Sequence, residues 1–130
     1  MNALDLPITV ALIEYFFYGT ADYIGDYIDE YIDFLPENLK EADYDDQVEW
    51  LCNFLDEHIT GLDTVTDYYD LESGYEDNHE ILNVDGKIIG VPFSYSSYNG
   101  IELQTGAKTL RECPEYELIQ VPKYARKEPC

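Results

Sequence analysis

Residues 22–33 carry five carboxylates at a spacing suited to binding positively charged groups. The segment is a four-residue repeat that reads Asp-Tyr-Ile-Gly, Asp-Tyr-Ile-Asp and Glu-Tyr-Ile-Asp. On an α-helix, these carboxylates would share an arc of roughly 100° along about 16 Å of the axis. Five charges over this length amount to one per about 3.3 Å, which is close to the ~3.4 Å per charge of one DNA strand. The five residues are Asp22, Asp26, Asp29, Glu30 and Asp33.

Two further stripes are predicted on the same helix. The isoleucines form the stripe farthest from the acids, and the tyrosines lie between the two: Tyr23, Tyr27 and Tyr31. This position predicts a half-buried shoulder with its hydroxyl groups in water. Tyrosine is also enriched in binding hot spots and stacks on arginine. We therefore expect Tyr23 and Tyr27 to contribute to a partner interface.

A second acidic helix is predicted over 44–59, with Asp43 as N-cap and Gly61 as its stop. Apolar residues recur at helical spacing on one face: Tyr44, Val48, Leu51, Cys52, Leu55 and Ile59. Carboxylates lie across from them: Asp45, Asp46, Glu49, Asp56 and Glu57. Trp50 and Phe54 fall at the border between the faces, where we expect a partner to reach them.

Residues suited to catalysis or metal binding are few. The chain has two histidines, His58 and His79, and no His-x-x-Glu-His, Gly-x-Ser-x-Gly or phosphate-loop motif. His58 is expected to be stabilised by the C-terminal end of its helix. An EF-hand needs oxygen ligands at alternate positions, a central glycine and a closing glutamate, and residues 70–80 do not keep that register. We therefore expect no enzyme activity, no metal and no cofactor.

The negative charge is concentrated in the first two thirds of the chain. The formal net charge is −21, with −22 in residues 1–86 and +1 in residues 87–130. Such a field repels nucleic acid and membrane phosphates, and it attracts basic surfaces. We therefore expect a basic protein partner, no direct nucleic-acid binding and no membrane association.

The charges of the repeat are not compensated by nearby bases. Solvated helix faces usually place lysine four residues from glutamate, because opposite charges at that spacing stabilise the helix. Here Asp22/Asp26, Asp26/Glu30 and Asp29/Asp33 are like-charge pairs, and the segment contains no base. This pattern favours a functional acidic surface over a merely solvated one.

Three further features indicate a cytoplasmic protein, in the host cell if it is phage-encoded. The three cysteines form an odd set without a Cys-x-x-Cys pair, which favours a reducing compartment. The N-terminus lacks the basic residues of a secretion signal. The longest apolar run, 8–18, is too short to span a bilayer.

The expected fold is a single α+β domain over 1–130, with acidic N-terminal helices packed on a C-terminal antiparallel sheet of hairpins. Helices at 7–18, 20–35 and 44–59 place the helical acidic part at 1–61. An ordered, acidic, tyrosine-rich loop is predicted at 62–79. The sheet at 80–122 contains hairpin turns at Asp85-Gly86 and Asn99-Gly100 and a last strand at 116–121. Residues 123–130 are a tail.

The pattern of acid-striped helices, few bases and many aromatic residues resembles the acidic DNA-mimic inhibitors of phages and mobile elements. That class includes anti-restriction, anti-CRISPR and glycosylase-inhibitor proteins. The resemblance covers residues 1–80 and lies in the charge pattern. It implies a stoichiometric inhibitor whose carboxylates stand in for phosphates in the nucleic-acid channel of a nuclease or another DNA- or RNA-binding protein, such as a restriction or CRISPR effector.

Other interpretations stay open. An immunity protein or antitoxin would use the same electrostatics with a shape specific to one basic toxin. A metal- or small-ligand-binding enzyme-like domain and a structural, oligomeric phage protein belong to different classes. The near-neutral residues 87–130 could serve as a scaffold, as the surface of a homodimer or as a second binding element.

Overall fold

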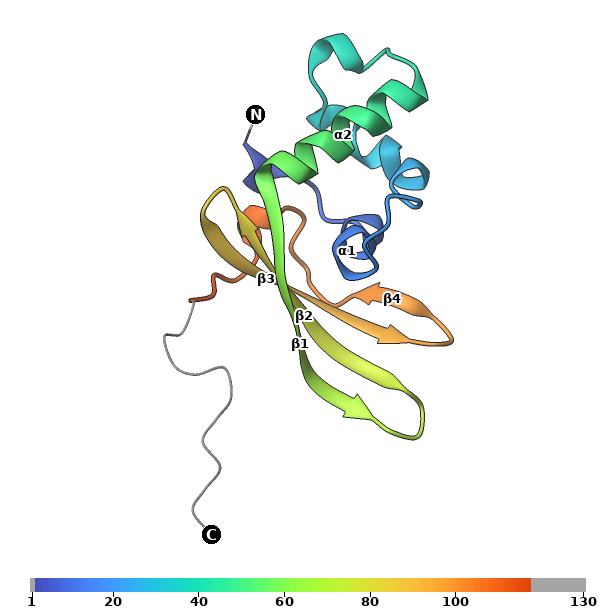
Figure 1. Ribbon diagram of the computed structural model, residues 1–130, viewed down its shortest axis with the longest axis vertical. Helices are drawn as coiled ribbons and strands as arrows, with labels where there is room; N and C mark the ends of the chain where they lie inside the picture. Colours follow the sequence, from blue (N-terminus) through green and yellow to red (C-terminus); the bar gives the residue numbers. More distant parts are fainter. Residues whose placement is uncertain (1, 118–130) are drawn as a thin grey trace.

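Helices gathered at one end of a four-stranded antiparallel sheet make up residues 2–117, the part of the chain that the computed structural model describes (Figure 1). The elements, with η for a 3₁₀ helix, are η1 (Ala3–Asp5), α1 (Val10–Phe17), η2 (Gly25–Phe34), η3 (Glu37–Leu39), α2 (Tyr44–His58), β1 (Ile59–Asp70), β2 (Tyr75–Val84), β3 (Lys87–Ser96), β4 (Gly100–Leu103) and η4 (Leu110–Glu112). All the helices except η4 precede the strands, so the predicted α+β class is confirmed.

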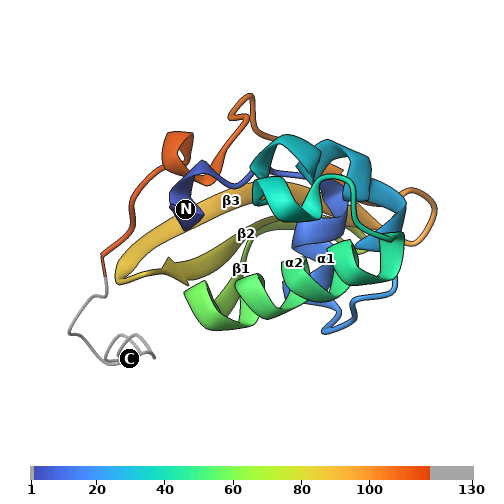
Figure 2. The same ribbon diagram turned by 90° about the horizontal axis from the view of Figure 1, so that it is seen from above.

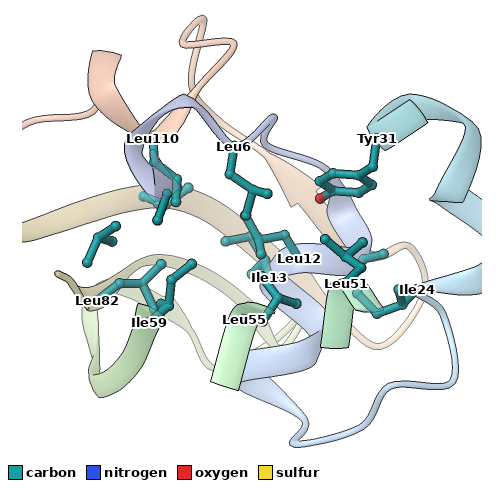
Figure 3. Close-up of a cluster of buried hydrophobic side chains, with 14 of the residues drawn as sticks. Leu6, Leu12, Ile13, Ile24, Tyr31, Leu51, Leu55, Ile59, Leu82 and Leu110 are labelled. Atoms are coloured by element: carbon teal, nitrogen blue, oxygen red, sulfur yellow. The ribbon is translucent and has the colours of Figure 1, made fainter. Parts of the chain in front are cut away.

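Helix α1 lies at the centre of the core. Its sequence is apolar on all sides except at Glu14, which is typical of a helix surrounded by protein. Leu12 and Ile13 are fully buried beside side chains from η2, α2 and the sheet (Figure 3). The predicted start near Pro7 was too early, because Pro7 forms a β-bridge with Thr109. The helix instead begins after Thr9, whose side chain accepts a hydrogen bond from the Leu12 N–H.

The acidic repeat forms a 3₁₀ helix, so the predicted α-helical geometry of 20–35 was wrong. Backbone bonds such as Asp26 N to Tyr23 O and Tyr27 N to Ile24 O span three residues. Residues three apart lie on one side of a 3₁₀ helix. Ile28, Tyr31 and Phe34 have this spacing, and they pack in or against the core. The three-residue spacing of these buried side chains therefore matches the observed helix, whereas the four-residue spacing of the repeat does not.

Helix α2 matches its prediction until its C-terminal end. Asp43 is the N-cap, and Leu51, Leu55 and Ile59 are buried as expected. The chain then passes directly from His58 into β1, so Gly61 lies in a strand and does not end the helix. The predicted loop at 62–79 was therefore wrong. Residues 59–70 and 75–84 pair as an antiparallel hairpin, with register shifts at Gly61/Asp63 and Thr66/Tyr68.

The sheet is a meander in the order β1-β2-β3-β4. Asp85 and Gly86 connect β2 and β3 with positive φ values of 51° and 96°, as the predicted type I′ turn requires. The second predicted hairpin is also present, between β3 and β4. Pro92 lies within β3, but its missing N–H costs no hydrogen bond to β2. The N and O of a residue in an antiparallel strand point to the same side, and the Pro92 carbonyl points away from β2 and accepts from Gln104 N.

The chain after β4 returns along the sheet. Residue Glu115 forms a bridge with Ile89, next to β3 and in line with β4. The predicted strand at 116–121 lies mostly outside the described residues, and the predicted tail at 123–130 lies wholly outside them.

Tyr31 connects η2 to α1. Its ring is fully buried, and its hydroxyl lies 2.9 Å from Thr9 Oγ1, the atom that caps α1. Burial raises the pKa of the Tyr31 phenol, so the neutral hydroxyl persists at all physiological pH values. One hydroxyl pair therefore connects the cap of the central helix to the segment that carries the acids.

We expect Tyr31→Phe to lower the free energy of unfolding by about 1–2 kcal/mol, because it removes a buried hydrogen bond and keeps the ring. Urea denaturation checks this value. Tyr23→Phe is the matched control, because the Tyr23 side chain is 45% exposed and its loss of a hydroxyl should change stability by less than about 0.5 kcal/mol. Equal stability of the two variants would contradict the role given to Tyr31.

Candidate functional site

The acids of the repeat are exposed in a different arrangement from the predicted single stripe. Asp26 and Asp29 share one column of η2, and Glu30 and Asp33 share a neighbouring column. Columns of a 3₁₀ helix are about 120° apart, and acids within a column are about 6 Å apart along the axis. Asp22 lies in the turn before the helix. The result is a two-column acidic surface on η2 and not a straight track of charges.

Helix α2 adds a second set of exposed carboxylates. Asp45, Asp46 and Glu49 are exposed on its first half, with Asp45 and Asp46 in the first turn. Acids are favoured there because the N-terminal end of a helix carries partial positive charge. Asp56 is exposed farther along and accepts a hydrogen bond from the Tyr15 hydroxyl. Burial and this bond raise the pKa of Tyr15.

Aromatic packing holds the two acidic helices side by side (Figure 2). The Phe34 ring lies 5.2 Å from that of Phe54 and 6.4 Å from that of Trp50, centroid to centroid. At the other end of the contact, the Tyr44 hydroxyl lies over Gly25, where a Cβ would be 1.6 Å from it. The acids of both helices therefore belong to one helical layer, which we call the acidic helical surface. It comprises Asp22, Asp26, Asp29, Glu30, Asp33, Asp45, Asp46, Glu49 and Asp56.

Within residues 2–117, no acid of this surface forms an ion pair. The nearest base in sequence, Lys40, pairs with Glu37 at 3.0 Å. Desolvation raises the pKa of the Glu14 carboxyl group, and the Asp26 carboxylate adds to this shift. These carboxylates are therefore available to bases of another molecule.

The aromatic residues proposed as anchors differ in accessibility. Tyr23 is exposed, Tyr27 is half-buried and Tyr31 is inside the core, so the expected uniform tyrosine shoulder was wrong. Trp50 is only partly exposed, because it stacks on Phe54, which is itself buried. Tyr44 was predicted in the core, but it is 54% exposed beside the acids. Its exposure could have been predicted from its place in the first helical turn, between two aspartates.

The β1–β2 hairpin carries acids and apolar side chains away from the helices (Figure 1). Nearly all of β1 is exposed, including the large side chains Leu62, Val65, Tyr68 and Tyr69. Asp63, Asp67 and Asp70 lie among them. These residues belong to the predicted loop at 62–79, whereas the structure shows that they form an edge strand.

Neither histidine belongs to a metal site in the described part of the chain, where no three His, Cys, Asp or Glu side chains gather closely enough to hold an ion. His58 Nδ1 lies 2.9 Å from Asp85 Oδ1, and His79 Nδ1 bonds to Asp67. Each ring therefore has one carboxylate partner.

Glu80 is a buried carboxyl group that the sequence did not reveal. It is 3% exposed on the helix-facing side of β2, and its Oε2 accepts from the Thr64 hydroxyl at 2.8 Å. Desolvation raises its pKa to about 7, Thr64 opposes the shift, and Asp63 adds to it.

Comparisons of the chain with protein-family models, with curated proteins and with solved structures find no match. None of the helices among residues 2–117 has the length and apolarity needed to cross a membrane.

Glu80 predicts a specific pH dependence of stability. Its folded pKa, about 7, exceeds the ordinary 4.5, so the folded state holds this proton more tightly. The resulting stabilisation is complete below pH 4.5 and is lost as the pH rises through 7. Between pH 5 and 8, the free energy of unfolding should therefore fall less in Glu80→Gln than in wild type, by on the order of 3 kcal/mol. Urea denaturation at several pH values measures this difference, and an unchanged pH profile would contradict it.

Proposed function

We propose that this chain is a stoichiometric protein inhibitor of the phage anti-defence type, whose acidic helical surface binds the nucleic-acid-binding surface of a basic protein. The partner would be a nuclease or another DNA- or RNA-binding protein, such as a restriction or CRISPR effector. The carboxylates would form charge-assisted hydrogen bonds with arginine and lysine in place of phosphate oxygens.

One observation carries this proposal: two adjacent helices expose carboxylates that have no ion-pair partner within residues 2–117. Like charges held close together destabilise a fold, and within residues 2–117 the column pairs Asp26/Asp29 and Glu30/Asp33 form no ion pair that offsets this repulsion. Binding of a basic partner would offset this repulsion and would account for the uncompensated negative charge. The exposed rings of Tyr23 and Tyr44 add apolar contacts beside it.

The geometry of η2 also supports a second candidate, an immunity protein or antitoxin. In the 3₁₀ helix, the four acids from Asp26 to Asp33 extend over about 14 Å, but they are divided between two columns about 120° apart. The charges of one DNA strand instead follow a single path at ~3.4 Å per charge. A less regular charge pattern is better suited to one complementary partner than to any phosphate channel.

The double reversal Asp26→Lys/Glu30→Lys tests the acidic helical surface. We expect it to weaken inhibition by at least about tenfold and to flatten the salt dependence, because attraction becomes repulsion at the centre of η2. The measurement is displacement of a labelled duplex or RNA from a purified basic partner, recovered from host lysate at low salt, over a salt gradient. The control Glu72→Lys/Glu117→Lys makes the same charge change at exposed positions away from η2 and α2. Equal inhibition by wild type and the η2 variant would refute the proposal.

Competition separates the two candidates. A nucleic-acid mimic should displace labelled DNA or RNA from several unrelated basic proteins in proportion to their charge. An immunity protein should protect one cognate toxin and leave the nucleic-acid binding of the other proteins unchanged. Fluorescence anisotropy on a panel of basic nucleases measures both outcomes at a single ionic strength.

A further inference from the structure

A hollow lies on the face of the sheet that is turned away from the helices. Leu82 and Val84 of β2 belong to the core, so strand alternation places His79 and Asp77 on the opposite face. The hollow has a volume of about 470 Å³, and its lining includes Asp67, Asp77, His79, Pro92 and Gln104. Residues from β1, β2, β3 and the segment after β4 therefore meet there.

Fixed contacts define the walls of this hollow. His79 bonds to Asp67 on one side, and the Tyr75 hydroxyl donates to Asp77 Oδ1 at 2.7 Å. On the far side, Gln104 donates from Nε2 to Ser94 Oγ at 3.0 Å and from its backbone N to Pro92 O at 3.0 Å. These bonds hold the lining side chains in place, so the site is largely formed before any ligand arrives.

The aromatic ring of His79 lines the hollow, and the ring of Tyr116 lies beside it, outside the lining. Pro92 lies directly opposite His79 in the β2–β3 register. The Tyr116 ring is 5.8 Å from the His79 ring, centroid to centroid, and it rests on Gly90, where a Cβ would be 2.2 Å from Tyr116 Cε1. Gly90 is therefore needed for the close approach of this ring. A planar cation can stack on an aromatic ring such as that of His79, whereas the compact ammonium of lysine gains less from this contact.

The charge of the lining selects a cationic ligand. Among the described residues, 2–117, it includes two carboxylates and neither lysine nor arginine. Each carboxylate has one oxygen bonded within the site, Asp67 Oδ2 to His79 and Asp77 Oδ1 to Tyr75. A guanidinium group offers five N–H donors in a planar fork that suits carboxylate oxygens.

Neighbouring side chains on the same face indicate a peptide and not a free small molecule. Val65 is opposite His79 and Tyr68 is opposite Asp77 in the β1–β2 register, so both lie on the face with the hollow. They are 41% and 55% exposed. Apolar residues on either side of an arginine in an extended segment would contact them.

We propose that this hollow binds an arginine side chain from an extended segment of the basic partner, with the flanking residues of that segment on Val65 and Tyr68. The inference rests on the proposed function, and it assigns the sheet as a second binding element. A second copy of this chain is a poor occupant, because two such acidic faces repel each other.

The test uses the full-length protein and capped Val-Arg-Val, with Val-Lys-Val and Val-citrulline-Val as comparison peptides. We expect the arginine peptide to shift the amide NMR signals of His79, Gly90 and Gln104 at low salt, and citrulline to shift none. Asp77→Asn and Asp67→Asn, each measured separately, should weaken binding by at least about fivefold through loss of charge-assisted contacts. Both changes keep an acceptor oxygen for the existing hydrogen bond. Glu72→Gln removes one charge from the exposed turn between β1 and β2, outside the lining, and it should leave affinity unchanged.

Several results would overturn the assignment. One is that the citrulline peptide binds as tightly as the arginine peptide, and another is that the NMR shifts are confined to η2 and α2. A third is that the arginine peptide binds only after Arg126→Gln, and a fourth is that the signals shift with protein concentration in the absence of peptide. The last two would identify the chain's own Arg126 or a second copy as the occupant. Asp26→Lys/Glu30→Lys should retain binding of the arginine peptide, so failure of the acidic helical surface and failure of the hollow are separately visible.

Discussion

A buried hydrogen bond between the hydroxyls of Thr9 and Tyr31 connects the central helix to the segment that carries the acidic repeat. The same Thr9 oxygen caps α1, so the start of α1 and the position of η2 depend on one small polar group. The rest of the helical layer follows from it. Phe34 of η2 contacts Trp50 and Phe54, and these contacts place α2 and its acids beside the repeat.

This internal constraint determines the shape of the acidic helical surface. A repeat of four residues would align its acids only on an α-helix, where residues four apart lie close together. The core instead takes up Ile28, Tyr31 and Phe34, which are three apart, and the helix is wound accordingly. Gly25 permits the winding to begin beneath Tyr44. The acids stay exposed, but their order on the surface follows from what is buried behind them.

The sequence predicted features that depend on local chemistry. Asp85-Gly86 accepts positive φ values, and the apolar spacing of α2 from Leu51 to Ile59 needs no knowledge of the rest of the chain. Strand β1 was missed because it is exposed on both faces, and so it lacks the apolar alternation that marks a half-buried strand. The hollow could not be foreseen either, since Asp67, His79 and Gln104 meet only through the register of four strands.

The two surfaces together restrict the shape of a common partner. One lies on the outside of the helical layer, and the other lies on the face of the sheet opposite that layer. A flat basic surface can contact only one of them at a time. A basic channel or cleft that encloses the chain can contact both, and a second contact tethered to the first acts at high effective concentration. Nucleic-acid channels have this enclosing form, so binding at both surfaces favours an inhibitor that fills a channel over one that covers a single patch.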